Sequence, residues 1–565
     1  MEANSYDCDL LVIGSGGGGL SAAVTARLLG LDVLVVEKAH VVGGTTATSG
    51  GVLWIPGNSI SSQSILKDDT QEKRLQYLHE LMGDDFNPLV DTYLEHGPKM
   101  IDFLVAKAGL EFDIAPAPDY HPALPGGVWG GRSLSAKPVR LKALHKAARN
   151  VRPMLAEMTL FGMSIGSGNN LADLFKFGRS VPATARVAGR LARHAIDVML
   201  HGRSTRLVNG NALMARLTSA FARAGGTIWT TAPVANLLFD NGAVTGAVVN
   251  RGGQPLQVRA KRGVILATGG IGHNVARRQS IYRHPAGAEE HLSLTAPGNV
   301  GDGLRLAESA GGHLDAQMPS AATWMPVSRV PRTDGTWGAV FHSVNTGKPG
   351  VIAVLRNGQR FVDESRNYHD LVGVLLRNQQ TSGPAGAFLI CDHRAFQRYG
   401  LGYAKPHLPL GRLIQSGYLI RAQTISELAE KAGVPADALM ETITAYNRSA
   451  AHGQDPEFGK GQDRFGHFMG DFSNPINPNV APLDKAPYYA VWMQPGDVGN
   501  FAGIKTDASA QVLDQAGHPV PGLYAVGNDM ASVFRGHYPG GGSMIGPAMT
   551  FGYVAARKIA DARAG

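Results

Sequence analysis

The feature that most constrains the fold is a glycine-rich turn near the N-terminus, within VIGSGGGGLSAAVTARLLGLDVLVVEK. Gly14, Gly16 and Gly19 have the spacing G-x-G-x-x-G, after an apolar strand and at the start of a helix. The first glycine permits a tight turn, the second lets backbone approach a pyrophosphate, and the third lets the helix pack on the strand. Glu37 ends the next strand, 23 positions after Gly14, where an acid can bond ribose hydroxyls. The segment therefore predicts a dinucleotide site in a Rossmann-like fold.

The length and the distribution of glycine indicate more than one domain. At 565 residues the chain is too long for one simple core. The 72 glycines gather in short motifs, which are sparse between residues 326 and 498 and then return. We therefore predict an α/β chain in which a discontinuous Rossmann-like domain (1–325 and 499–565) is interrupted by an α+β domain (326–498). Cys8 and Cys391 lie far apart in apolar segments, so neither a disulfide nor a metal site is expected.

Three further glycine loops indicate which cofactor the site binds. They are VVGGTTATSGG (41–51), ATGG (267–270) and GLYAVGND (522–529). Together with the first motif they resemble the flavoprotein group that contains fumarate reductases and succinate dehydrogenases, in which such segments surround FAD. The resemblance covers nearly the whole chain apart from a basic segment. It implies noncovalent FAD, because GGTTATSGG contains no histidine, the residue to which some of those enzymes attach flavin.

The residues that this resemblance assigns to FAD lie in five segments along the chain. They are Gly14, Gly16, Gly17, Gly19, Glu37, Lys38, Gly43, Gly44, Thr45, Thr46, Ser49, Gly50, Gly51, Val234, Ala267, Thr268, Gly269, Asp302, Gly527, Asn528, Gly542, Met544 and Ile545.

Three tyrosine contexts point to one branch of the group. They are PDYHPALPGG with Tyr120, GQRFVDESRNYHDL with Tyr368, and GHYPGGGSMIG with Tyr538 and Gly542. In combination they resemble 3-ketosteroid Δ1-dehydrogenase, and the blocks PYYAVWMQPGDVGNFAGIKTD and GVPADALMETITAYNRSAAHGQD also fit that family. The resemblance implies 1,2-desaturation of a 3-ketosteroid in steroid or sterol degradation, with 326–498 as a catalytic cap and an external electron acceptor of unknown identity.

The chemistry explains why tyrosines and a bare backbone are needed. Removing a proton from C2 requires a polarised C3 carbonyl, so the Tyr538 hydroxyl and the Gly542 N–H are expected to hold its oxygen as it becomes an enolate. By the resemblance, Tyr368 is the base for the C2 proton and Tyr120 assists it, while a hydride passes from C1 to FAD N5. A free tyrosine has a pKa near ~10, so the base requires activation. The sequence does not show how that activation arises.

Other functions stay open at this point. A Δ4-(5α)-dehydrogenase uses sister chemistry, although Tyr120 and the Tyr-x-x-x-Gly spacing at Tyr538 favour the Δ1 reaction. A fumarate-reductase-like enzyme, or a flavin or sterol binder without turnover, would also suit the glycine motifs. Each tyrosine taken alone is more often a packing residue than a catalyst.

A basic segment predicts a further partner. Between Arg140 and Arg206 there are twelve Lys and Arg residues against three acids, so this stretch carries the whole net charge of +8. Arg179, Arg186, Arg190 and Arg193 stand near helical spacing beside apolar residues, which is typical of an amphipathic helix on an anionic membrane surface. A solvated or oligomer-facing insertion is the alternative. No reader motif supports nucleic acid.

The cellular location follows from the same segment and from the N-terminus. The first residues have no basic region typical of a secretion signal, and no run of about 18 apolar residues occurs. We therefore expect a cytoplasmic protein that is attached through about 140–205 to the inner face of the cell membrane.

Overall fold

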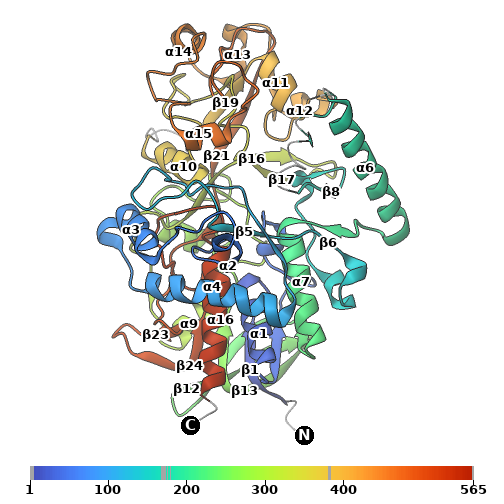
Figure 1. Ribbon diagram of the computed structural model, residues 1–565, viewed down its shortest axis with the longest axis vertical. Helices are drawn as coiled ribbons and strands as arrows, with labels where there is room; N and C mark the ends of the chain where they lie inside the picture. Colours follow the sequence, from blue (N-terminus) through green and yellow to red (C-terminus); the bar gives the residue numbers. More distant parts are fainter. Residues whose placement is uncertain are drawn as a thin grey trace. The chain divides into compact units, whose positions relative to one another are not determined.

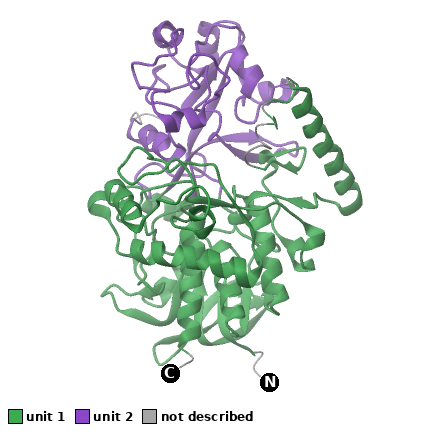
Figure 2. Cartoon of the chain, viewed as in Figure 1, with its two compact units in different colours: residues 1–281, 295–322, 499–565 green, residues 282–294, 323–498 purple. Residues whose placement is uncertain are grey.

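The computed structural model describes residues 5–166, 173–174, 176–178, 180–378, 384–406 and 408–562 (Figure 1). The chain divides into two compact units, coloured separately in Figure 2. Unit 1 comprises residues 1–281, 295–322 and 499–565, and unit 2 comprises 282–294 and 323–498.

The boundaries of the units differ from the prediction in one respect that has a physical cause. The predicted first segment of the discontinuous domain runs without interruption to 325. The corresponding part of unit 1 ends at 322 and lacks residues 282–294. Those residues belong to unit 2 because β14 (Leu292–Ser293) pairs in parallel with β21 (Tyr488–Asn500) of the unit 2 sheet. The prediction is wrong for this stretch, since a short excursion of the chain has no compositional signature.

Unit 1 is built on a mainly parallel sheet. Its parallel strands follow the order β10-β2-β1-β13-β24, as in a Rossmann-like fold. The long strand β13 bonds to antiparallel β12 along its first half and to β24 along its second. The central strands are apolar and buried, as expected of strands covered on both faces. The strands of this sheet are β1 (Ser5–Ile13), β2 (Val33–Val36), β10 (Thr227–Trp229), β11 (Val234–Asp240), β12 (Ala243–Arg251), β13 (Gln254–Leu266), β23 (Gln511–Leu513) and β24 (Pro519–Ala525).

The last helix of the chain packs on the first. Helices α1 (Gly17–Leu28) and α16 (Ile545–Asp561) approach closely because each presents glycine at the crossing. A Cβ at Gly18 would lie 2.9 Å from the carbonyl oxygen of Ala548, and one at Gly552 would lie 2.4 Å from the oxygen of Gly18. This contact closes the discontinuous domain.

Other helices and strands complete unit 1. The helices are α2 (Ser59–Ser62), α3 (Gln71–Met82), α4 (Leu89–Ala108), α6 (Val181–His201), α7 (Asn209–Arg223), α8 (Val275–Ile281) and α9 (Asp302–Ser309). The strands are β3 (Val52–Trp54), β4 (Phe112–Ile114), β5 (Ser133–Ala136), β6 (Val139–Arg140), β7 (Thr159–Leu160), β8 (Met163–Ser164), β9 (Arg206–Leu207), β15 (Leu314–Asp315) and β22 (Gly503–Ile504).

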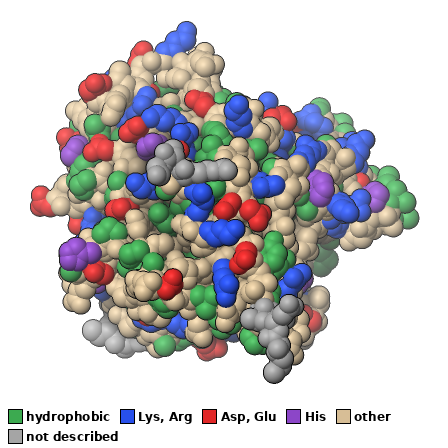
Figure 3. Space-filling model, turned by 90° about the horizontal axis from the view of Figure 1, so that it is seen from below, with side chains coloured by type: hydrophobic (Ala, Val, Ile, Leu, Met, Phe, Trp, Pro, Cys, Tyr) green, Lys and Arg blue, Asp and Glu red, His purple; other side chains and the backbone are tan. Residues whose placement is uncertain are grey.

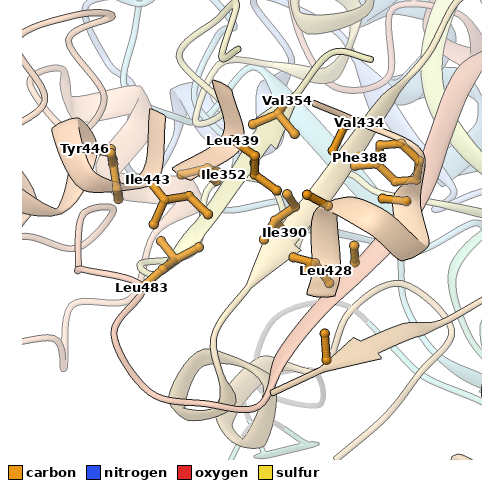
Figure 4. Close-up of a cluster of buried hydrophobic side chains, with 14 of the residues drawn as sticks. Ile352, Val354, Phe388, Ile390, Leu428, Val434, Leu439, Ile443, Tyr446 and Leu483 are labelled. Carbon is orange, nitrogen blue, oxygen red and sulfur yellow. The ribbon is translucent and has the colours of Figure 1, made fainter. Parts of the chain in front are cut away.

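Unit 2 is an α+β unit around a second sheet with the order β17-β16-β21-β19-β18. Helices α13 and α14 pack on β18 and β19 through buried side chains such as Ile352, Ile390 and Leu439 (Figure 4). The two units together confirm the predicted fold class, a discontinuous Rossmann-like domain with an inserted α+β domain. The remaining elements of unit 2 are β16 (Ala322–Pro331), β17 (Trp337–Phe341), β18 (Val351–Val354), α10 (Tyr368–Arg377), β19 (Ala387–Cys391), α11 (His393–Tyr399), α12 (Gly411–Gln415), β20 (Ile420–Ala422), α13 (Ile425–Ala432), α14 (Ala436–Ala450) and α15 (Arg464–Met469).

A fully buried charge network lies in unit 2 just ahead of α10. The Arg360 guanidinium binds both oxygens of Glu364 and both oxygens of Asp455, at 2.8 to 3.0 Å. The Lys460 ammonium lies 3.2 Å from Glu364. Burial alone would raise the pKa of Glu364, but Arg360 and Lys460 lower it to about 2. The segment that leads to Tyr368 is therefore anchored by paired charges.

The predicted basic insertion has its two ends side by side. Strands β6 and β9 pair antiparallel, with Val139 opposite Leu207 and Arg140 opposite Arg206. Within the insertion, Arg186 and Arg190 both bind Asp173 at 2.7 Å, so part of the positive charge is neutralised. Arg179 lies outside the described residues.

Helix α6 of this insertion leaves an apolar face open. It buries Ala183 and Val187 on one side, whereas Val181, Ile196 and Met199 are 85%, 56% and 84% exposed. Figure 3 shows hydrophobic and basic side chains together on the projecting part that α6 forms at the right. Among the described helices, α6 included, none is both long and apolar enough to cross a membrane.

Removing one partner from the Arg360 network should destabilise unit 2. Asp455→Ala leaves buried positive charge without its carboxylate, and such a loss costs about 3–5 kcal/mol of unfolding free energy. Glu457→Ala is the matched control, because its carboxylate lies 3.8 Å from Arg360 but is 59% exposed; it should change stability by less than about 1 kcal/mol. Denaturant unfolding measures both, and equal effects would contradict the role of the buried network.

Candidate active site

The turn between β1 and α1 has the shape of a phosphate cradle. Gly14 has a φ of +110°, and a Cβ there would lie 2.1 Å from the carbonyl oxygen of Ala267. A Cβ at Gly19 would lie 2.2 Å from the oxygen of Gly14. At Gly16 an added Cβ would meet nothing within 4 Å, so open space lies above the backbone where α1 begins. The first turn of α1 has no acidic residue, and the positive end of a helix suits a pyrophosphate.

Glu37 lies beside this cradle, at the end of β2. Its Oε2 accepts hydrogen bonds from the N–H of Ser15 (3.1 Å) and from the Ser15 hydroxyl (2.6 Å). Its Oε1 accepts from the N–H of Ala39 at 2.9 Å. The carbonyl of Glu37 binds Ala232, close to Val234 at the start of β11. The acid is thus held where a ribose ligand is expected.

Lys38 and Asp302 form an ion pair of 2.5 Å, with both side chains 31% exposed. Asp302 is the first residue of α9, where the positive end of the helix favours a carboxylate. Two of the residues that the resemblance assigns to FAD, Lys38 and Asp302, are thus paired at the start of α9.

The loop from Gly43 to Gly51 packs on the start of α1. The Thr46 hydroxyl accepts a hydrogen bond from the N–H of Gly17 at 3.2 Å. The Thr45 hydroxyl accepts from Ala296 and Asn299. The remaining predicted residues of this loop are Gly43, Gly44, Ser49, Gly50 and Gly51; a Cβ at Gly44 would lie 3.4 Å from the Cα of Gly16, and Ser49 accepts the N–H of Gly51.

Asp529 joins the ends of β13 and β24, and it was not predicted from the sequence. Its carboxylate accepts the N–H and hydroxyl of Thr268 and the N–H of Gly270. Burial raises the pKa of Asp529 to about 6, and the hydrogen bonds from Thr268 and Gly270 oppose that rise. The loops that contain Ala267, Thr268 and Gly269, and Gly527 and Asn528, are thereby held together.

Two buried asparagines reinforce the same junction. Asn299 donates to the carbonyl of Gly269 at 2.7 Å and to Thr45 at 3.1 Å. Asn500 accepts the N–H of Ile271 and donates to the carbonyl of Asn528. For Asp529 the sequence offered only its position, an acid directly after Gly527 and Asn528, which does not show the backbone groups that it binds. For the asparagines it offered none, because their partners are distant in sequence.

The glycine turn before α16 lies against both α1 and β3. Ile545 starts α16, and its Cγ2 is 3.7 Å from the position of a Cβ at Gly17. Met544 is the N-terminal cap of the helix. Gly542 has a φ of +105°, and a Cβ there would lie 2.5 Å from the N of Trp54. Within the described residues the Gly542 N–H has no acceptor, so it is available to a ligand.

Tyr120, Tyr538 and Gly542 come together in unit 1. The rings of Tyr120 and Tyr538 meet edge to face with centroids 5.3 Å apart. The N–H of Tyr120 donates to the carbonyl of Pro539 at 2.9 Å. The Tyr120 hydroxyl lies 3.6 Å from the position of a Cβ at Gly541. The structure thus gathers three of the four predicted catalytic residues at the turn that precedes α16.

Tyr368, the fourth, is in unit 2 as the first residue of α10. Asn367 caps this helix by accepting the N–H of Asp370 at 3.0 Å. His369 is buried, and its Nδ1 accepts the N–H of Trp324 at 3.1 Å. Tyr368 therefore sits half-buried at a helix start whose neighbours are held in place.

The comparisons with known proteins point in one direction. A family model that describes an FAD binding domain matches residues 9–545. The 4-oxocyclohex-2-ene-1-carboxylate 5-dehydrogenase of Sinomonas cyclohexanicum is 39% identical over 558 residues, which cover 98% of this chain and 94% of that protein. The 3-oxosteroid 1-dehydrogenase of Mycobacterium tuberculosis is 36% identical over 569 residues, 98% of each chain.

A solved structure shows the same likeness. The 3-ketosteroid Δ1-dehydrogenase of Sterolibacterium denitrificans, solved in complex with 1,4-androstadiene-3,17-dione, superposes with a TM-score of 0.90 at 33% identity. The match covers 99% of this chain and 100% of that one. The open space at Gly16, the ribose-side Glu37 and the loops joined by Asp529 fit the cofactor that this family binds. The chain therefore belongs to the FAD-binding domain family and is an FAD-dependent oxidoreductase, which confirms the predicted kinship with the 3-ketosteroid Δ1-dehydrogenases.

Proposed function

We propose that this protein desaturates 3-ketosteroids between C1 and C2. The observation that carries the proposal is the convergence of Tyr120, Tyr538 and the available Gly542 N–H at the start of α16. That helix start adjoins the phosphate cradle through Ile545. The names of two of the three relatives above support the same reaction.

Tyr538 and Gly542 would bind the C3 carbonyl oxygen. Tyr538 is 5% exposed, so its hydroxyl acts in a site of low dielectric constant. A phenol O–H and a backbone N–H aimed at one oxygen stabilise the enolate that develops when the C2 proton leaves. The N-terminus of α16 adds positive potential at the same place.

Tyr368 would take the C2 proton, and Tyr120 would assist by hydrogen bonding. As the first residue of α10, Tyr368 lies at the positive end of a helix dipole, which favours a phenolate. FAD supplies the acceptor for the hydride that leaves C1. The flavin would be held noncovalently by the segments around Gly16, Thr46 and Asp529, and an external acceptor would reoxidise it.

A second substrate class has a specific observation in its favour. The relative that is 39% identical is named for a small oxocyclohexene carboxylate, whose ring ketone allows the same desaturation. A carboxylate substrate would need a free cation near the tyrosines. In unit 1 the Arg132 guanidinium is paired with Asp69 and Asp119, and Arg535 is paired with Asp315 at 2.7 Å. These two arginines are therefore already bound to carboxylates of the chain itself.

The insertion between β6 and β9 would attach the protein to the inner face of the cell membrane from the cytoplasm. The exposed apolar stripe of α6 would enter the headgroup region together with the exposed Arg193 of the same helix, and Lys142, Lys146 and Arg149 are further exposed cations of the insertion. A sterol substrate dissolves in the bilayer, so this location would supply it.

Adding a 3-ketosteroid under anaerobic conditions should bleach the flavin. With 4-androstene-3,17-dione or 4-cholesten-3-one the visible flavin absorbance should fall, and the product should carry a new C1–C2 double bond. Oxidation of a reduced dye by fumarate would indicate the reductase alternative. A 5α-saturated steroid that yields only a 4-ene would indicate the Δ4 enzyme. Bleaching by 4-oxocyclohex-2-ene-1-carboxylate alone would contradict the steroid assignment.

Tyr538→Phe should keep FAD and steroid binding but lower kcat by about 10²–10³-fold, because one donor to the enolate oxygen is lost. Tyr553→Phe in α16 is the control, since its hydroxyl contacts Arg557 rather than the glycine turn. Stopped-flow flavin reduction measures both variants. Unchanged turnover in Tyr538→Phe would leave this tyrosine as a packing residue.

Charge on the apolar stripe of α6 should release the protein from membranes. The double variant Ile196→Glu, Met199→Glu should no longer sediment with vesicles that contain anionic lipid, because burying two carboxylates in the headgroup region is unfavourable. Phe472→Glu is the control, since Phe472 is 76% exposed in unit 2. Continued sedimentation of the double variant, or release of both, would refute attachment through α6.

A further inference from the structure

We infer that Asp119 is a positioning residue for Tyr120: it holds the backbone and ring of Tyr120 against the glycine turn 539–542. This inference rests on the proposed function, because it gives Asp119 a role only if Tyr120 acts in the reaction. It concerns a residue whose side chain makes its contacts away from the ketone-binding groups.

The main chain around Asp119 is paired with the turn that carries Tyr538. Asp119 and Gly540 form an antiparallel bridge, and Tyr120 donates its N–H to the Pro539 carbonyl at 2.9 Å. The Tyr77 hydroxyl donates to the same carbonyl at 2.6 Å. The geometry of Tyr120 relative to Tyr538 therefore depends on where residue 119 is held.

The Asp119 side chain is held by three donors, one from β3 and two from the loop before β5. Its Oδ1 accepts the indole N–H of Trp54 at 2.8 Å. Its Oδ2 accepts the Arg132 guanidinium at 2.8 Å and the N–H of Val128 at 3.1 Å. The carboxylate is 1% exposed. Burial raises its pKa to about 6 against the opposing effect of Arg132, so it is ionised at neutral pH.

Arg132 makes this a rigid anchor. It is 1% exposed and also binds Asp69 at 2.6 Å and the carbonyl of Gly126 at 2.9 Å. Its guanidinium lies 5.4 Å from the ring centre of Tyr77, the other donor to Pro539. Two routes, through Asp119 and through Tyr77, thus connect one buried cation to the same turn.

Trp54 connects Asp119 with the far end of the turn. A Cβ at Gly540 would lie 2.6 Å from the Trp54 ring, and one at Gly542 would lie 2.5 Å from the Trp54 N. The glycine turn therefore packs directly on Trp54. The Asp119 carboxylate holds Trp54 by accepting its indole N–H, and the main chain of Asp119 holds the neighbouring Tyr120.

An amide at position 119 cannot satisfy the same three donors. Its oxygen can accept from Trp54 or from Arg132 and Val128, whereas its NH₂ would face a donor on the other side. Asp119→Asn should therefore shift the main chain at Tyr120 while it preserves side-chain volume. A displacement of about 1 Å at a positioned group costs up to about 10²-fold in rate.

The test compares four forms of the holoenzyme with the ketone that the wild type desaturates: wild type, Asp119→Asn, Tyr120→Phe and the double variant. We expect Asp119→Asn to lower the rate of flavin reduction by about 10- to 100-fold with KM changed less than about threefold. In the Tyr120→Phe background, Asp119→Asn should lower the rate of flavin reduction by less than about threefold. If Asp119 acts through Tyr120, the losses caused by the two substitutions do not add.

The outcomes separate the two levels of the proposal. Full activity in Tyr120→Phe would refute the role of Tyr120 itself. If Tyr120→Phe reduces flavin slowly but Asp119→Asn does so at the wild-type rate, the inference about Asp119 alone is overturned. The same holds if the losses in rate of the two single variants add fully in the double variant. If Asp119→Asn fails to retain FAD, Asp119→Glu, which keeps the charge but lengthens the side chain, enters the same cycle. It should show the same non-additive loss, and additivity there would equally refute the inference.

Discussion

The contact on which unit 1 depends is the close approach of the main chain at the ends of β1 and β13. At Gly14 and Gly19 the backbone leaves no room for a side chain, so strand, turn and helix are pressed together. Gly16 stands between them with open space in front of it. The same shape that brings the elements together thus leaves one exposed edge of backbone for a phosphate.

The other walls of the cofactor site are joined to this junction by side chains from distant parts of the chain. Thr46 accepts the first N–H of α1, and Asp529 ties the loop after β13 to the loop after β24. Each hydrogen bond to the Asp529 carboxylate adds only a small net free energy of folding. Removing the carboxylate would cost more, because two buried backbone N–H groups would lose their acceptor. Asp529 and α16 follow unit 2 in the chain, so the last segment, 499–565, returns to unit 1.

Buried cations anchor both segments that contribute candidate catalytic tyrosines. Arg132 binds Asp69 and Asp119 next to Tyr120, and Arg360 binds Glu364 and Asp455 ahead of Tyr368. Buried ion pairs add little to stability compared with apolar packing, but they define geometry through their directional bonds. The residues before Tyr120 and before Tyr368 have irregular backbone with few hydrogen bonds of a helix or sheet. The side-chain ion pairs therefore fix the position of these segments.

The amino-acid sequence by itself determined the glycine turn, the strand–helix–strand order and the acid at Glu37, because these depend on local spacing. It also showed which residue types were available for the chemistry at Tyr120, Tyr368 and Tyr538. Tertiary structure alone decided that residues 282–294 join unit 2, that Asp529 and Asn299 bind the cofactor loops, and that Asp119 lies beside Trp54 and Arg132. These partners are tens to hundreds of positions apart in the chain. No local pattern encodes them, since burial and the pairing of charges are properties of the packed fold.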